Sequence, residues 1–181
     1  MGKIYDAIDG RLREFVLRQP VFFVATAPAR GHVNVSPKGM RGSFAVLDGR
    51  TVAYLDYTGS GIETIAHLRE NGRITVMFCA FDGPPTIVRL HGRGEAVVPD
   101  DPRFADLLGF FDAMPTHGLR SVIVVDVERV SDSCGFAVPL LDYVGERTLL
   151  TDSHSRKSVD HLAEYRKLKN ATSIDGLPGL R

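Results

Sequence analysis

The residues best suited to chemistry lie in the run YLDYTGSGIETIAHLRENGR, residues 54–73. An apolar strand there leads through a Gly-Ser-Gly turn into a helix that we expect from about Ser60 to Asn71. Ser60 and Glu63 have the spacing of a capping box, which would fix the helix start. Backbone amides at a glycine-flanked helix start can also bind a phosphate. Because the run lacks Gly-Lys-Ser/Thr and has Thr64 at the third glycine position of GxGxxG, it indicates either a plain helix start or a phosphate site.

Polar side chains alternate along a second expected strand, HVNVSPKG. His32, Asn34 and Ser36 would share one face, since side chains along a strand alternate between its faces. We expect Pro37 to break the strand pairing, and Lys38 beyond it can reach an anionic ligand. This face either lines a site or is simply solvated.

A third candidate is the long strand expected over Thr86–Ala96. Ile87, Arg89, His91 and Arg93 would share one of its faces. Two arginines and a histidine on one face could line a site for an anion, because guanidinium groups suit phosphate and carboxylate. The alternative is an exposed basic stripe.

Other catalytic patterns are missing. The six histidines lack HxxxH and HExxH spacing, so no metal site is expected. The chain has no GxSxG, which disfavours a hydrolase with a nucleophile elbow. Cys79 lies in an apolar strand and Cys134 in an expected loop, so neither a disulfide framework nor a CxxC site is expected. A reducing, cytoplasmic location is the default expectation.

Composition limits the remaining classes. With 181 residues, the chain is expected to form one domain over 1–181, ending in a helix and tail from about 150. The formal net charge of zero disfavours nucleic-acid binding. No apolar stretch approaches the roughly 18–20 residues of a membrane span, and the N-terminus lacks the apolar region of a secretory signal.

The elements that position these residues are mostly strands. Asp48-Gly49 indicates a hairpin. Helices are expected over residues 4–19, after an N-cap at Asp101, and near 158–169. Six or seven strands without regular strand–helix alternation predict a mainly β, α+β fold, namely an antiparallel barrel with peripheral helices.

Taken in order, VNVSPKG (33–39), the hairpin, residues 54–78 and IVRLHGRGEAV (87–97) resemble the pyridoxamine 5'-phosphate oxidase-like, FMN-binding split-barrel family. The resemblance covers roughly residues 1–130. It implies a six-stranded antiparallel split barrel that forms a homodimer, with FMN at the interface between subunits.

The resemblance also implies site residues. The family's flavin-contacting strand matches Val33–Lys38, its next flavin segment matches the end of the strand before the turn, and its phosphate turn matches the helix start. A ring-contacting glutamine of the family falls near Ile87, on the face that carries Arg89. The cofactor-binding residues expected on this basis are Asn34, Val35, Ser36, Lys38, Tyr54, Leu55, Ser60, Gly61, Thr64 and Arg89. No catalytic side chain is assigned.

The function implied is an FMN-dependent oxidoreductase that transfers hydride or electrons through the flavin N5, acting on a small molecule. Glu63 and Thr64 stand where the oxidases carry Arg-Lys, and the chain has no tryptophan. The resemblance therefore implies flavin binding more strongly than a pyridoxamine phosphate substrate. Two alternatives stay open: a non-enzymatic FMN or haem carrier or sensor, and an F420-dependent reductase. The latter ranks lower because few Lys or Arg residues lie near the turn.

Overall fold

The structure of the protein is a computed structural model, which describes residues 2–180. It consists of eight strands and five helices. In chain order they are β1 (Ile4–Tyr5), α1 (Gly10–Arg18), β2 (Phe22–Thr26), β3 (Asn34–Lys38), β4 (Phe44–Val46), β5 (Thr51–Tyr57), α2 (Glu63–Asn71), β6 (Arg73–Cys79), β7 (Ile87–Val97), α3 (Phe104–Leu108), β8 (Leu119–Ser133), α4 (Leu149–Ser155) and α5 (Val159–Lys169).

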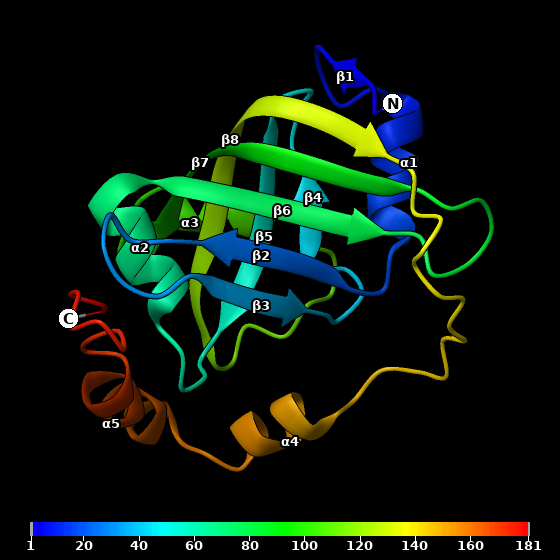
Figure 1. Ribbon diagram of the computed structural model, residues 1–181. Coiled ribbons are helices and arrows are strands. Elements are labelled where there is room, and N and C mark those ends of the chain that lie inside the picture. The colour runs from blue at the N-terminus through cyan, green and yellow to red at the C-terminus, as the bar shows by residue number, and fades with distance from the viewer. Residues whose placement is uncertain (1, 181) are drawn as a thin grey trace.

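The strands form one curled antiparallel sheet in the order β3-β2-β6-β7-β8-β5-β4, with β1 paired to β8. In Figure 1, β4 and β5 lie behind β2 and β6, so the sheet folds back on itself. The two longest strands, β7 and β8, make this curl. Their register shifts at His91/Gly92, and a Cβ on Gly92 would lie 2.0 Å from the carbonyl oxygen of Asp126. Only glycine permits this close approach of the two strands.

The core fills the inside of the curl. Alternate residues of the strands point inward, as the period of two requires. Phe22 packs against Phe44, Tyr54 and Phe78, with ring centroids 5.2–5.7 Å away. The helix α1 adds Leu12 and Val16 to this cluster. The result is the α+β split barrel expected from the sequence, with seven strands along the sheet path rather than six.

Several predicted boundaries are wrong. Residues 4–9 do not belong to the first helix, because Ile4 and Tyr5 pair with β8 and Asp9 caps α1 through its side chain. The helix α2 begins at Glu63, with Ile62 and not Ser60 at its N-cap. The predicted capping box therefore does not form.

Two further local predictions also need correction. The helix α3 begins at Phe104, so Asp101 is not its N-cap; Asp101 instead accepts a hydrogen bond from the Arg103 amide at 2.9 Å. Pro37 does not break β3, because it pairs with Phe23 inside the strand. Proline is tolerated there because β3 is an edge strand, where no neighbour needs the missing N–H.

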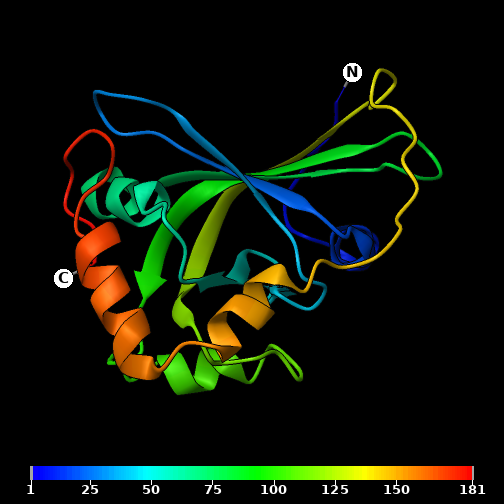
Figure 2. The ribbon, with the colours of Figure 1, turned by 90° about the horizontal axis from the view of Figure 1, so that it is seen from below.

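The hairpin at Asp48-Gly49 is confirmed by the pairing of β4 with β5. The last helix is confirmed as α5, capped by the Ser158 side chain, whereas α4 was not predicted. After β8 the chain runs along the open side of the sheet, carries α4 and α5, and ends beside α2 (Figure 2). Among residues 2–180, no helix has the length and apolar character that crossing a bilayer requires.

Candidate functional site

A polar cavity of about 300 Å³ lies where β3, the end of β5 and the start of α2 meet. Five expected residues line it: Asn34, Ser36 and Lys38 from β3, and Gly61 and Thr64 from the turn and helix. The β3 residues come from alternate positions, so one strand face supplies all three. This was predicted for Asn34 and Ser36, whereas Lys38 was expected beyond a strand break and His32, expected on this face, lies outside β3 and contacts Asp175. The other lining residues are Pro37, Tyr57, Gly59, Glu63 and Arg120.

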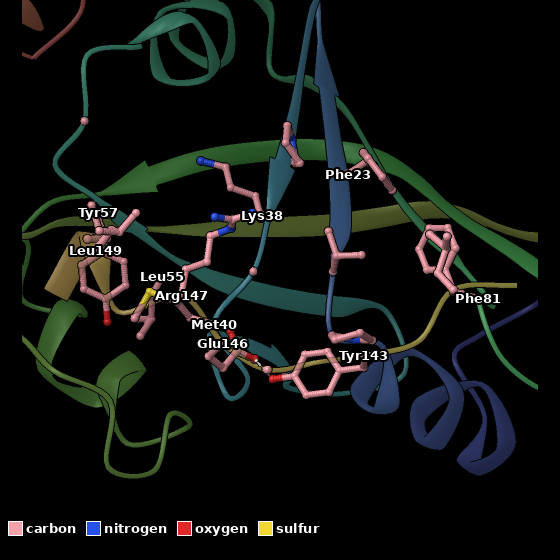
Figure 3. A pocket seen from close by; sticks show the side chains of 18 of the residues that line it. Phe23, Lys38, Met40, Leu55, Tyr57, Phe81, Tyr143, Glu146, Arg147 and Leu149 are labelled. Atoms are coloured by element: carbon pink, nitrogen blue, oxygen red, sulfur yellow. Dashed lines mark hydrogen bonds between the residues drawn. The ribbon is translucent and has the colours of Figure 1, made fainter. Parts of the chain in front are cut away.

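A larger cavity of about 810 Å³ adjoins it and is mostly apolar. One wall consists of β2, β3 and the end of β5, including Phe23 and Leu55. The opposite wall is segment 141–150, with Tyr143 and Leu149. Figure 3 shows Lys38 in this cavity between Tyr57 and Phe23. An apolar cavity of this size with a few polar groups is typical of small-molecule sites.

The two cavities share four lining residues, Pro37, Lys38, Tyr57 and Gly59. Polar and apolar spaces therefore meet along one short stretch of β3 and the end of β5. The Tyr57 hydroxyl donates a hydrogen bond to the Pro115 carbonyl at 2.7 Å. Burial raises the pKa of Tyr57 to about 12, so this phenol is neutral at physiological pH.

A buried carboxylate fixes the cations of the polar cavity. Asp56 is 1% exposed, and its Oδ1 lies 3.1 Å from the Lys38 Nζ. Its Oδ2 lies 2.7 Å from the Arg120 Nε and accepts a hydrogen bond from the Ser121 hydroxyl. Burial raises the pKa of Asp56, but Lys38 and Arg120 outweigh burial and hold the pKa below its usual value. Asp56 is therefore ionised and orients both cations.

A hydrogen-bond chain lies beneath the same cavity. The Asn34 side-chain amide lies 3.3 Å from the Thr64 hydroxyl and 3.4 Å from the Thr26 hydroxyl, and its oxygen accepts from Ser36. The Thr26 hydroxyl lies 2.9 Å from Nδ1 of the buried His67. This chain fixes the positions of the groups that face the cavity.

The start of α2 is less open to an anion than the sequence predicted. The Glu63 carboxylate accepts a hydrogen bond from the Ile62 amide at 3.0 Å and another from the Ile174 amide at 3.3 Å. It also adds a negative charge to the cavity lining. The side chains of Lys38, Arg120 and Thr64 must therefore contribute to holding any phosphate.

The C-terminal segment braces the turn that lines both cavities. Asn170 is fully buried, and its side chain donates to the Gly59 carbonyl at 2.8 Å. Its oxygen accepts a hydrogen bond from Arg120 at 3.0 Å. Arg166 donates to the Thr58 hydroxyl, and the ring of His154 donates to the Thr58 carbonyl. Residues 154–170 thus position the turn at 58–60.

The remaining expected residues lie apart from the polar cavity. Leu55 lines the apolar cavity. Tyr54 lies in the core, Ser60 is exposed, and Val35 points outward from β3 with 62% of its surface exposed. Arg89 lies on the outer face of β7 and donates to the Ser133 hydroxyl at 2.9 Å.

Sequence reasoning missed Asp56, Arg120 and segment 141–150. A sequence signal exists for the first two, because each places a charge in or beside an apolar strand, YLDY and LRSVIVV. A charge that a strand buries needs a partner. No comparable pattern marks the segment.

The donor set of the polar cavity, two cations with hydroxyl and amide groups, fits a phosphate. Among residues 2–180, no three His, Cys, Asp or Glu side chains gather closely enough to hold a metal ion.

Replacing Asp56 by asparagine tests the buried ion pairs. We expect D56N to lower the free energy of unfolding at neutral pH by about 3 kcal/mol, because two cations lose a buried partner. As pH falls below about 4 and then through the lowered pKa of folded Asp56, the carboxylate becomes protonated. The wild type then loses the same stabilisation. The difference in free energy of unfolding between the wild type and D56N should therefore become smaller, and urea unfolding measures it.

The control is D126N, since Asp126 is an exposed carboxylate on the same strand as Arg120. We expect it to change the free energy of unfolding by less than about 0.5 kcal/mol. A difference in free energy of unfolding between the wild type and D56N that stays constant down to about pH 3 would contradict the ionised state assigned to Asp56.

Three comparisons with known proteins agree with this fold. A family model described as pyridoxamine 5'-phosphate oxidase matches residues 8–134. The pyridoxamine 5'-phosphate oxidase family protein ustO from Aspergillus flavus is 46% identical over 195 residues, covering 99% of this chain and 78% of that protein.

Solved structures show the same fold at low identity. HupZ from Group A Streptococcus is 24% identical, with a TM-score of 0.54 over 68% of this chain and 91% of that one. An FMN-binding protein from Syntrophomonas wolfei is 14% identical, with a TM-score of 0.50 over 65% of this chain and 80% of that one. The family-model match and the identity to ustO together show that this chain belongs to the pyridoxamine 5'-phosphate oxidase family.

Proposed function

We propose that the protein binds FMN and acts with it as an oxidoreductase on a small molecule. The observation that carries this proposal is the meeting of a polar and an apolar cavity at Lys38, Tyr57 and Gly59. FMN has the matching shape, with a flat ring at one end and a phosphate at the other. Membership of the pyridoxamine 5'-phosphate oxidase family supports a flavin, as does the fold shared with the FMN-binding protein from Syntrophomonas wolfei.

The polar cavity would hold the phosphate and the apolar cavity the ring. Lys38 and Arg120 would supply positive charge, and Thr64 with Asn34 would supply hydrogen bonds. When bound, the flavin supplies hydride transfer at its N5, which requires no protein acid or base as the main actor. The wall formed by segment 141–150 would limit water in the apolar cavity.

Lys38 has a defined part in this proposal. Asp56 holds its ammonium group at the junction of the two cavities. The charge of Lys38 would therefore lie between phosphate and ring. There it can stabilise the negative charge of the phosphate and the negative charge that reduction adds to the ring. Tyr57 stays protonated beside it and so offers a neutral surface for the ring.

The proposal includes a homodimer. Figure 1 looks onto the outer face of β2, β3, β6 and β7, and no helix crosses it. This face exposes Val33 and Val35 at 69% and 62%. Pairing places Arg89 three strands from Pro37, about 14 Å at the usual strand spacing. Arg89 would therefore serve a flavin held mainly by the partner subunit.

The FMN phosphate can be tested by comparing FMN with riboflavin, which lacks it. We expect T64V to weaken FMN binding about tenfold, because a partly charged hydrogen bond is lost. Riboflavin binding should not change. T86V, at a half-buried threonine before β7 that lines neither cavity, is the control and should affect neither ligand. Fluorescence titration measures both affinities, and an equal loss for FMN and riboflavin would contradict a phosphate at Thr64.

An anaerobic reduction assay distinguishes an oxidoreductase from a protein that only carries the cofactor. Under anaerobic conditions, NADH or NADPH should bleach the absorption bands of the bound flavin faster than those of free FMN. Mass identification of the released cofactor confirms which flavin is present. A flavin that binds tightly but is reduced by neither nucleotide would favour the carrier.

The homodimer predicts a specific effect on the outer sheet face. We expect V35E to yield monomers and to lose bound flavin, because a charge would be buried at the interface. V159E, at a valine on α5 that is 67% exposed, should stay dimeric and keep the flavin. Sedimentation velocity measures both, and a V35E protein that stays dimeric would contradict this interface.

A further inference from the structure

A second polar cavity of about 360 Å³ lies between α5, the end of α2 and the start of β8. Four basic side chains line it: Arg69 of α2, Arg120 of β8, and Arg166 and Lys167 of α5. The one acidic lining residue is Asp100, which is exposed. We call this space the α5 cavity. It lies outside the apolar cavity and shares only Arg120 with the polar one.

Two of its four cations are already paired. Arg120 binds the buried Asp56, and Lys167 pairs with Glu164 on the surface. Within residues 2–180, neither Arg69 nor Arg166 forms an ion pair with a carboxylate. Arg69 donates to the Gly179 carbonyl, and Arg166 donates to the Thr58 hydroxyl. The α5 cavity therefore has two guanidinium groups without a compensating anion among the described residues.

The packing of Arg166 points the same way. Its guanidinium is partly buried, and burial lowers its pKa, as does the nearby charge of Arg120. Arg120 has the Asp56 carboxylate beside it, but Arg166 has no carboxylate partner among the described residues, so an anion beside Arg166 would offset its repulsion with Arg120. The fork geometry of guanidinium suits the oxygens of a phosphate.

We propose that the α5 cavity is a binding site for a phosphate group, either inorganic phosphate or a small phosphate monoester. A phosphate dianion would match the two unpaired guanidinium charges. The cavity volume leaves room for a small organic group beyond the phosphate. This site is separate from the proposed flavin site and does not depend on flavin being bound.

Occupancy would also act on the turn at 58–60. Arg166 holds Thr58, and Arg120 holds Asn170, which in turn holds Gly59. A phosphate on Arg69 and Arg166 would offset the repulsion between Arg166 and Arg120 and strengthen the contact between α5 and that turn. The bound phosphate would therefore stabilise the protein, as any ligand of the folded state does.

Calorimetric titration with inorganic phosphate and with glycerol 3-phosphate tests the site in the protein as purified, against chloride at equal ionic strength. We expect saturable binding of at least one, and the tighter of the two identifies the source of the phosphate. R166Q and R69Q should each weaken it about tenfold, the loss of one charged contact. K169Q removes a charge from the same helix outside the cavity and should change nothing.

The outcomes separate this site from the flavin site. T64V should leave phosphate affinity unchanged; a T64V loss without an R166Q loss would place the anion in the polar cavity and overturn the proposal. Equal phosphate affinity in the wild type, R166Q and R69Q would also overturn the proposal, as would the absence of saturable binding. If R166Q fails to fold, R69Q decides, since Arg69 does not contact the turn at 58–60. Phosphate binding that depends on Arg69 and Arg166, in a protein that takes up no FMN on titration, would support this site and reject the proposed flavin site.

Discussion

The structure around the site depends on one buried carboxylate. Asp56 lies on β5 and binds Lys38 of β3 and Arg120 of β8, so three strands meet at a single charge. Burying a carboxylate is costly unless cations and hydrogen bonds compensate it. This requirement fixes the two cations at the polar cavity. Through Asn170, Arg120 extends the same constraint to the turn at 58–60.

The C-terminal segment supplies part of the lining and support of both cavities. Segment 141–150 forms a wall of the apolar cavity, and α5 braces the turn shared by both cavities. The family-model match ends at residue 134, so these contributions come from outside it. The match to ustO covers 99% of this chain and so includes this segment.

Local sequence patterns predicted the parts that depend on neighbours in the chain. Alternation predicted that Asn34 and Ser36 share one face, and Asp48-Gly49 formed the expected hairpin. Lys38 joins that face because Pro37 does not break the strand. Contacts between distant residues were not predictable in this way. Residues 4 and 5 are not helical because they pair with the edge of β8. Glu63 is the first residue of α2, and its carboxylate accepts a hydrogen bond from the distant Ile174 amide. The sequence marks Arg120 as a charge in an apolar strand, but its partner Asp56 can be identified only from the pairing of β8 with β5.

A crystal structure of the protein with FMN would show where the cofactor binds. We expect the phosphate to lie in the polar cavity, in contact with Thr64 and with Lys38 or Arg120. The ring should lie in the apolar cavity against Tyr57. An FMN phosphate bound on the Arg89 face or in the α5 cavity, with the polar cavity containing only solvent, would show that the polar cavity is not the phosphate site.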